Sequence, residues 1–179
     1  IPDILCFVNG LPLAVIECKS PFITNPMEAG IDQLLRYANR RTPENDEGAE
    51  KLFHYNLMMV STHRDKARVG TITSRMEHYL EWKDPYPSTL SKDGKEFFFR
   101  ADVEGLDYPK GALIPPSISE MVIEPNAQEI MLYGLFDRAN FLDILQNFTV
   151  FEPVDGRIIK KIPRYQQFRA VHKTIERLK

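Results

Sequence analysis

The stretch IPDILCFVNGLPLAVIECK, residues 1–19, decides the fold of this chain because it contains two strand-like runs with a turn between them. The runs 3–8 and 13–19 are rich in branched and aromatic residues, and Asn9-Gly10 separates them, which is a strong signal for a β-hairpin. Both runs are apolar on both faces except at a few odd-numbered positions. We therefore expect strands that are covered on both sides.

Three charged residues stand in this apolar hairpin, Asp3 on the first run and Glu17 and Lys19 on the second. Side chains alternate along a strand, so Glu17 and Lys19 face the same side, about 6–7 Å apart. A carboxylate and an ammonium on one face of a buried strand are unfavourable unless they pair or bind something. An E-x-K tripeptide alone is often a solvated surface pair, but its apolar flank here favours the end of a central strand.

The register of the hairpin determines whether Asp3 joins Glu17. A two-residue loop would set Asp3 opposite Ile16, on the other face of the sheet. A three-residue loop that includes the preceding valine, with Gly10 left-handed as a G1 bulge, sets Asp3 opposite Val15 and makes Asp3 and Glu17 diagonal neighbours. A site that uses both carboxylates therefore requires an odd-length loop or a bulge.

Such a triplet has the chemistry of a metal-dependent phosphodiesterase. Two carboxylates offer hard oxygen ligands for Mg²⁺, which prefers few protein ligands and keeps several waters. A lysine beside them can orient or deprotonate the attacking water and neutralise charge on a phosphate.

A helix follows the hairpin. Asn25 is predicted as its N-cap, with Pro26 at N1 and Glu28 completing a capping-box-like start, and the helix is expected to run to about residue 40. Gln33 and Tyr37 are one turn apart and therefore share a face, where both could bond a phosphate or the lysine. Alone, such a pair is more often a solvent-facing rim.

The rest of the chain indicates an α/β protein with a domain boundary near residue 150. We expect an exposed loop at 42–50, strands at 55–61 and 67–73, an irregular excursion at 84–118, helices at 127–136 and 138–148, a hairpin turning at Asp155-Gly156 and an amphipathic helix at 165–179. The chain begins inside a strand-like run without a methionine, so we expect a piece of a longer protein.

Composition excludes several other classes. The formal charge of −2 gives no global positive field for nucleic acid, although a local basic patch or bound cations can replace it. Cys6 and Cys18 lie in apolar runs and indicate a reducing compartment, so we expect the cytoplasm. The four histidines are scattered, which argues against zinc, and the apolar stretches are too short for a membrane span.

Pro2-Asp3, Glu17-Cys18-Lys19 and Gln33-(x)3-Tyr37 together resemble the PD-(D/E)xK nuclease motif with the glutamine–tyrosine extension of its RecB-like branch. The surrounding sequence resembles the amino-terminal part of the restriction (motor) subunit of type I restriction enzymes, over nearly the whole chain and least through 84–118. The resemblance implies a restriction-endonuclease-like α/β fold, with a mixed central sheet flanked by helices. It also implies residue roles: Asp3, Glu17 and the backbone carbonyl of Cys18 as Mg²⁺ ligands, Lys19 as the catalytic lysine, and Gln33 and Tyr37 as supports for DNA or for the geometry of the site.

The same resemblance assigns residues 1–150 to the nuclease domain, with its amino-terminal part missing, and residues 151–179 to a linker and the start of a helicase-like motor. The segment PRYQQ, residues 163–167, resembles the adenine-reading glutamine motif before such a motor, with Gln167 as the reader. ATP would then serve the full-length protein, since no GxxxxGK[ST] phosphate loop occurs in this chain. Two exposed helix residues are the alternative interpretation of Gln166 and Gln167.

The function implied is a Mg²⁺-dependent endonuclease that cuts double-stranded DNA after ATP-driven translocation, in a complex with modification and specificity subunits. One alternative is a non-catalytic assembly module that docks the motor to the modification subunits, which the acidic and proline-rich segments would favour. Another is a stand-alone RecB-like repair nuclease, against which the Gln167 segment argues.

Overall fold

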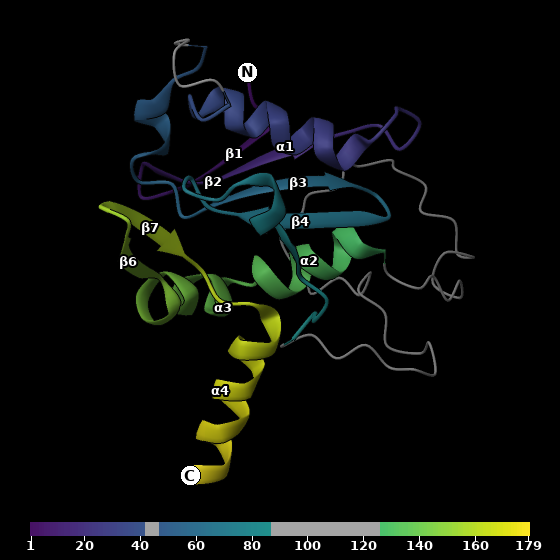
Figure 1. Cartoon of the computed structure of the whole chain (residues 1–179). Coiled ribbons are helices and arrows are strands. Elements are labelled where there is room, and N and C mark those ends of the chain that lie inside the picture. The colour runs from purple at the N-terminus through teal and green to yellow at the C-terminus, as the bar shows by residue number, and fades with distance from the viewer. Residues whose placement is uncertain (42–46, 87–125) are drawn as a thin grey trace, which may run out of the picture.

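The computed structural model describes residues 1–41, 47–86 and 126–179, which form one five-stranded sheet, a separate two-stranded hairpin and helices on both faces of the larger sheet (Figure 1). The large sheet contains β1 (Ile4–Val8), β2 (Leu11–Cys18), β3 (Met58–His63), β4 (Lys66–Gly70) and β5 (Leu80–Glu81), in that spatial order. The excursion expected at 84–118 lies outside the described residues from residue 87 onward.

The sheet is mixed because β2 and β3 are parallel and its other neighbours are antiparallel. A parallel pair needs a crossover connection, and α1 (Pro26–Tyr37) with the short 3-10 helix η1 (Glu50–Phe53) supplies it. Helix α1 covers one face of the sheet, and α2 (Ala127–Leu135) and α3 (Arg138–Asp143) lie on the other (Figure 1). The expected mixed α/β arrangement is therefore confirmed.

Two apolar clusters, one on each face, hold β2 and β3 in the middle. Alternate residues of the two strands enter opposite clusters: Ala14 and Met58 pack on the α2 side, whereas Val15 and Met59 pack on the α1 side with Ile31. Burial on both faces explains why these strands lack the polar alternation of a half-exposed sheet. The expectation of strands covered on both sides is confirmed for β2, whose residues 13–17 are buried. It is wrong for β1, which lies at the edge of the sheet and leaves Ile4 and Phe7 exposed.

The hairpin turn has two residues rather than the predicted three, and a β-bulge further along the hairpin shifts the strand register instead. Asn9 and Gly10 both have positive φ, 50° and 81°, as a two-residue type I′ turn demands. The predicted three-residue loop with Asp3 opposite Val15 is therefore wrong. Instead, Cys6 pairs with Ala14 while Phe7 pairs with Pro12, so Leu13 is left as the extra residue of a β-bulge.

The start of α1 differs from its prediction. Pro26 does occupy the first turn, but Asn25 adopts a left-handed conformation with φ 49° and its side chain makes no capping hydrogen bond, so the expected capping box is absent. The helix ends at Tyr37 rather than near residue 40, because Asn39 turns left-handed with φ 54°. Its apolar stripe is nevertheless buried, at Met27, Ile31 and Leu34.

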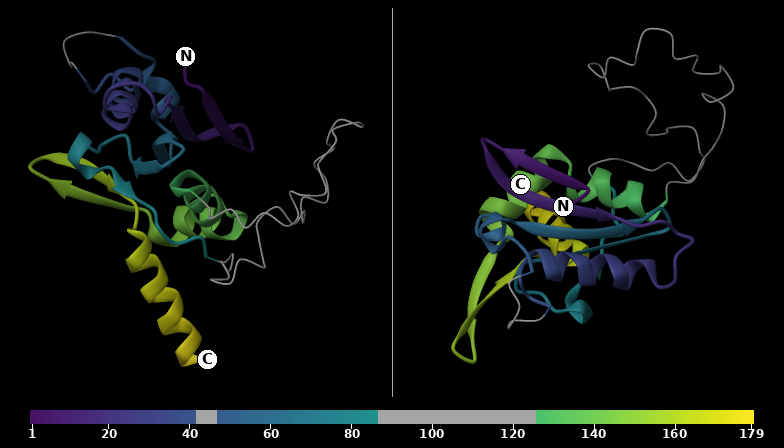
Figure 2. Two further views of the ribbon diagram at one scale, coloured as in Figure 1. Left: turned by 90° about the vertical axis from the view of Figure 1, so that its right-hand side faces the viewer. Right: turned by 90° about the horizontal axis from the view of Figure 1, so that it is seen from above.

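The carboxyl-terminal part begins with helices and ends in a hairpin and a projecting helix. The helix predicted at 138–148 is α3 followed by a π-helical turn, η4 (Ile144–Phe148), and the predicted hairpin is β6 (Val150–Val154) with β7 (Arg157–Lys161). Helix α4 (Tyr165–Leu178) buries Phe168 among the core residues on the α2 side, then extends away from the body (Figure 2). No helix in the described ranges is long and apolar enough to cross a membrane.

Strand boundaries in the middle of the chain also shift, since β3 begins and ends later than predicted and β4 ends at Gly70. A 3-10 turn, η2 (Met76–His78), leads into β5. The start of β6 coincides with the boundary expected near residue 150, yet Phe168 packs with the core of the large sheet. The division into two domains stays a prediction.

Candidate active site

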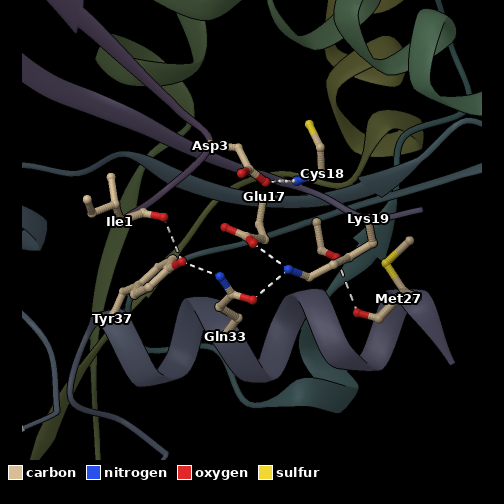
Figure 3. Close-up of polar contacts among 9 residues, drawn as sticks. Ile1, Asp3, Glu17, Cys18, Lys19, Met27, Gln33 and Tyr37 are labelled. Atoms are coloured by element: carbon tan, nitrogen blue, oxygen red, sulfur yellow. Dashed lines mark hydrogen bonds and ion pairs between the residues drawn. The ribbon is translucent and has the colours of Figure 1, made fainter. Parts of the chain in front are cut away.

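The charged residues of the first hairpin gather at the carboxyl end of β2, on the side that faces helix α1 (Figure 3). Glu17 is the last buried residue of that strand, with 1% of its surface exposed, and Lys19 follows with 16% of its side chain exposed. Asp3 precedes β1 and is exposed to solvent. The site therefore contains one buried carboxylate, that of Glu17, and one accessible carboxylate, that of Asp3.

The bulge brings Asp3 to this site. Ile4 pairs with Ile16, and continuing that register by one residue sets Asp3 against Glu17. One carboxylate oxygen of Asp3, Oδ2, accepts a hydrogen bond of 2.8 Å from the backbone N–H of Cys18 (Figure 3). Asp3 and Glu17 thus share a face directly rather than diagonally, and the requirement for a bulge or odd register is met.

A directed hydrogen-bond chain runs from Glu17 across to helix α1 (Figure 3). The Lys19 ammonium forms an ion pair with Oε1 of Glu17 and donates to Oε1 of Gln33 at 2.5 Å. Because an ammonium can only donate, Gln33 must turn its carbonyl oxygen toward it, and its amide NH2 then donates to the Tyr37 hydroxyl. That hydroxyl donates to the carbonyl of Ile1 at 2.8 Å.

This chain fixes the lysine from two sides. The expected pairing of Glu17 with Lys19 and the shared face of Gln33 and Tyr37 are both present in the structure. Of the two helix residues, Gln33 contacts the lysine directly, and Tyr37 contacts Gln33. Their roles in a reaction stay a prediction.

The second carboxylate oxygen of Glu17 is the unusual group of the site. Oε2 is buried and has no hydrogen-bond partner, although one lone buried carboxylate oxygen is strongly unfavourable. An oxygen of this kind beside a second carboxylate suits a hard divalent cation. No group of three or more His, Cys, Asp or Glu side chains within metal-binding reach occurs in the described residues, so an ion here would need backbone oxygen and water as further ligands.

The Cys18 thiol does not add a metal ligand of its own. Burial, with the neighbouring carboxylates of Asp3 and Glu17, raises the pKa of this thiol, and Lys19 opposes them more weakly. The thiol therefore stays protonated at neutral pH, and its sulfur points away from the Glu17–Lys19 pair (Figure 3). Only the backbone of Cys18 is available to the site, as its variable position in the motif suggests.

A close approach of α1 to β3 completes the packing around the lysine, and no local sequence pattern predicts it. Ser61, buried on β3, donates its hydroxyl to the carbonyl of Met27 on α1 at 3.2 Å. A Cβ added at Gly30 would overlap the Ser61 hydroxyl and lie 3.4 Å from Cγ of Lys19. Gly30 therefore lets the helix lie close enough for Gln33 to reach Lys19.

Gly30→Ala is expected to destabilise the protein by about 1–3 kcal/mol, because the helix must move off the strand. Helix propensity alone predicts the opposite sign, since alanine is favoured over glycine by roughly 1 kcal/mol. Urea denaturation of Gly30→Ala, Ser61→Ala and the double variant separates the two effects. The double variant should recover most of the loss, and a stabilised single variant would contradict the close approach.

Gln167 lies apart from this site, at the start of α4. Its Oε1 accepts a hydrogen bond of 2.9 Å from the backbone N–H of Arg164 and so caps the helix. Helix α4 extends on the side of the sheet opposite α1 in both views (Figures 1 and 2). A role in reading adenine stays a prediction.

Fold and site together define a mixed α/β protein with an acidic pair and a lysine at the end of its first hairpin. Residues 1–78 match the model of the family described as "Type I restriction enzyme R protein N terminus". The matched part includes all five hairpin and helix residues of the site. The expected resemblance to the amino-terminal part of the restriction subunit of type I restriction enzymes is confirmed.

Similar curated proteins extend the match over almost the whole chain. The chain is 29% identical over 177 residues to the type I restriction enzyme HindI endonuclease subunit of Haemophilus influenzae. It is 27% identical over 180 residues to the putative MjaVIIIP endonuclease subunit of Methanocaldococcus jannaschii, and 23% over 176 residues to the MjaIXP subunit of the same organism. These alignments cover 98%, 99% and 98% of this chain, but only 14%, 13% and 14% of the relatives.

Proposed function

We propose that this chain is the metal-dependent endonuclease part of a type I restriction enzyme subunit, with a PD-(D/E)xK fold, and that it hydrolyses phosphodiester bonds of double-stranded DNA. The observation that carries the proposal is the buried, unpartnered Oε2 of Glu17 beside the accessible carboxylate of Asp3. The family of residues 1–78 and the names of the three relatives, all endonuclease subunits, support it.

Asp3, Glu17 and the backbone carbonyl of Cys18 would hold Mg²⁺. A bound Mg²⁺ supplies positive charge that polarises the phosphodiester and stabilises the charge developing on it. Lys19, held by Glu17 and Gln33, would place its ammonium next to this charge, where it could neutralise the phosphate and orient the attacking water. Gln33 and Tyr37 act by fixing that ammonium, since their hydrogen bonds all run toward it or toward Ile1.

The larger activity belongs to the proposal as well, because the chain spans about one seventh of its relatives. We propose that in the full-length subunit an ATP-driven motor translocates DNA, and that modification and specificity subunits complete the complex. Gln167 would then read adenine, after breaking the hydrogen bond with which its side chain caps α4. The cytoplasm suits both the DNA substrate and the two free thiols.

Isothermal titration with Mn²⁺ tests the metal site directly. We expect saturable binding to the wild-type chain and a roughly ten- to hundred-fold weaker affinity for Asp3→Asn, which removes a ligand charge. Asparagine keeps an oxygen that can still accept from the Cys18 N–H, so the hairpin should stay in place. The control is Asp155→Asn, in the β6–β7 turn, where a φ of 48° suits asparagine equally well.

Two results would count against the nuclease. Wild-type protein that folds but binds no Mn²⁺ would favour the non-catalytic assembly module instead. Equal affinities in wild type and Asp3→Asn would show that the ion binds elsewhere.

A further inference from the structure

The Leu13 bulge determines whether Asp3 can take part in the site. Without it, the pairing of Val8 with Leu11 at the turn would continue in step and set Asp3 opposite Ile16, on the wrong face. With it, the ladder advances by one residue on β2, and Asp3 reaches Glu17. The feature that holds this bulge therefore controls the geometry of the acidic pair.

Two donors from the approach to β3 hold the bulge through one carbonyl. The oxygen of Leu13 accepts from the backbone N–H of Leu57 at 2.7 Å and from the side-chain amide of Asn56 at 3.3 Å. Both bonds draw this carbonyl toward β3 and away from β1.

Asn56 is itself held rigidly. Its side chain is fully buried, its backbone N–H donates to the carbonyl of Phe53 at 3.2 Å, and its backbone carbonyl accepts from the ammonium of Lys160. Its side-chain oxygen has no partner. A buried unpaired acceptor is unfavourable, so an apolar residue would be more stable at this position. The hydrogen bond that the Asn56 amide donates to Leu13 is what an apolar residue could not provide.

The clamp on Asn56 comes from the far end of the chain. Lys160 lies on β7, and the side chains of Thr71 and Thr73 bind its backbone: both hydroxyls donate to its carbonyl, at 2.8 and 3.1 Å, and its N–H donates to Thr73 Oγ1 at 2.9 Å. These bonds fix the β6–β7 hairpin against the large sheet. The lysine head is thereby directed at the carbonyl of Asn56.

We propose that Asn56 is a positioning residue of the site: it holds the Leu13 bulge and so sets Asp3 beside Glu17, with Lys160 clamping it from the β6–β7 hairpin. Asn56 acts through Leu13 and Asp3 and needs no contact with metal or DNA. The purpose of this placement rests on the proposed metal site, but the placement itself has a metal-free signature. That signature is the hydrogen bond from the Cys18 N–H to Asp3.

Amide hydrogen exchange of the whole chain, with Asn56→Leu, tests the placement. The substitution keeps the approximate shape and removes the donor to Leu13, so exchange of the Cys18 amide should accelerate roughly ten-fold relative to the central amides of β3. The matched control is Asn140→Leu. Asn140 is also buried and donates its side-chain amide to backbone carbonyls, those of Tyr86 and Gly134, but it lies on α3. In that variant the relative exchange of Cys18 should stay unchanged.

The same variants titrated with Mn²⁺ separate this inference from the proposed function. Faster Cys18 exchange with a roughly ten-fold weaker Mn²⁺ affinity in Asn56→Leu alone supports both. Faster exchange in a chain whose wild type binds no Mn²⁺ supports the positioning and removes the metal site. Cys18 exchange and Mn²⁺ affinity that both match the wild type overturn the positioning role. If Asn56→Leu does not fold, Lys160→Met, which releases the clamp from outside, must produce the same change in the Cys18 amide or the inference fails.

Discussion

Glu17→Gln is expected to abolish Mn²⁺ binding and to lower DNA cleavage by the full-length subunit in its complex by about 10²–10³-fold or more, while leaving the metal-free protein at least as stable as the wild type. The loss follows from the position of Glu17, which is the one buried carboxylate of the site. Removing the charge that holds the ion forfeits several kcal/mol of transition-state stabilisation, which corresponds to a loss in rate of about this size.

We expect Glu17→Gln to leave the stability of the metal-free protein unchanged or to raise it. In the metal-free protein Glu17 carries a buried charge with one oxygen unpaired, while its partner Lys19 keeps access to water. A neutral side chain of the same shape relieves that burial, and replacing buried charges by neutral groups is often neutral or stabilising. A need to bind a ligand is the simplest explanation for a buried carboxylate that destabilises the metal-free protein.

Urea denaturation with and without Mn²⁺ measures both halves together. The ion should stabilise the wild type in proportion to the logarithm of its concentration and leave Glu17→Gln unaffected. Glu152→Gln is the control, because Glu152 also pairs with a lysine, Lys161, but on an exposed hairpin. A metal-free Glu17→Gln protein that is several kcal/mol less stable than the wild type would show that the carboxylate serves the fold instead.

The sequence was sufficient wherever the structure depends on local periodicity. Strand alternation predicted the shared face of Glu17 and Lys19, and helical spacing predicted that of Gln33 and Tyr37. These patterns need only neighbours within a few residues. The burial of β2 on both faces followed from its uninterrupted apolar run in the same way.

The parts that the sequence missed depend on residues far apart along the chain. The register was predicted from the turn alone, whereas the bulge lies at Leu13 and is held by Asn56, 43 residues further on. Lys160, which clamps Asn56, lies 104 residues beyond it. The Gly30–Ser61 approach likewise joins a helix and a strand. No local rule predicts such partners, because each is selected by the packing of the completed fold.

Lys19→Met should change Mn²⁺ affinity and stability in the opposite directions to Glu17→Gln, although both variants should lose cleavage. We expect Mn²⁺ binding to persist or tighten, because a positive charge next to the carboxylates is removed. Cleavage by the full-length subunit in its complex should fall by about 10²–10³-fold, since the ammonium that neutralises the phosphate is gone. The metal-free chain should lose about 1–3 kcal/mol, because Glu17 remains buried without its partner.

These opposite signs separate a catalytic lysine from a structural one. Lys161→Met breaks an exposed pair on β7 and should change neither Mn²⁺ affinity nor cleavage, which controls for the loss of a lysine as such. Mn²⁺ should restore most of the stability lost in Lys19→Met, because the ion replaces the missing positive charge beside Glu17. If Lys19→Met instead cut DNA at the wild-type rate, the ammonium would have no part in the reaction, and the chain through Gln33 and Tyr37 would serve only to hold α1 against the hairpin.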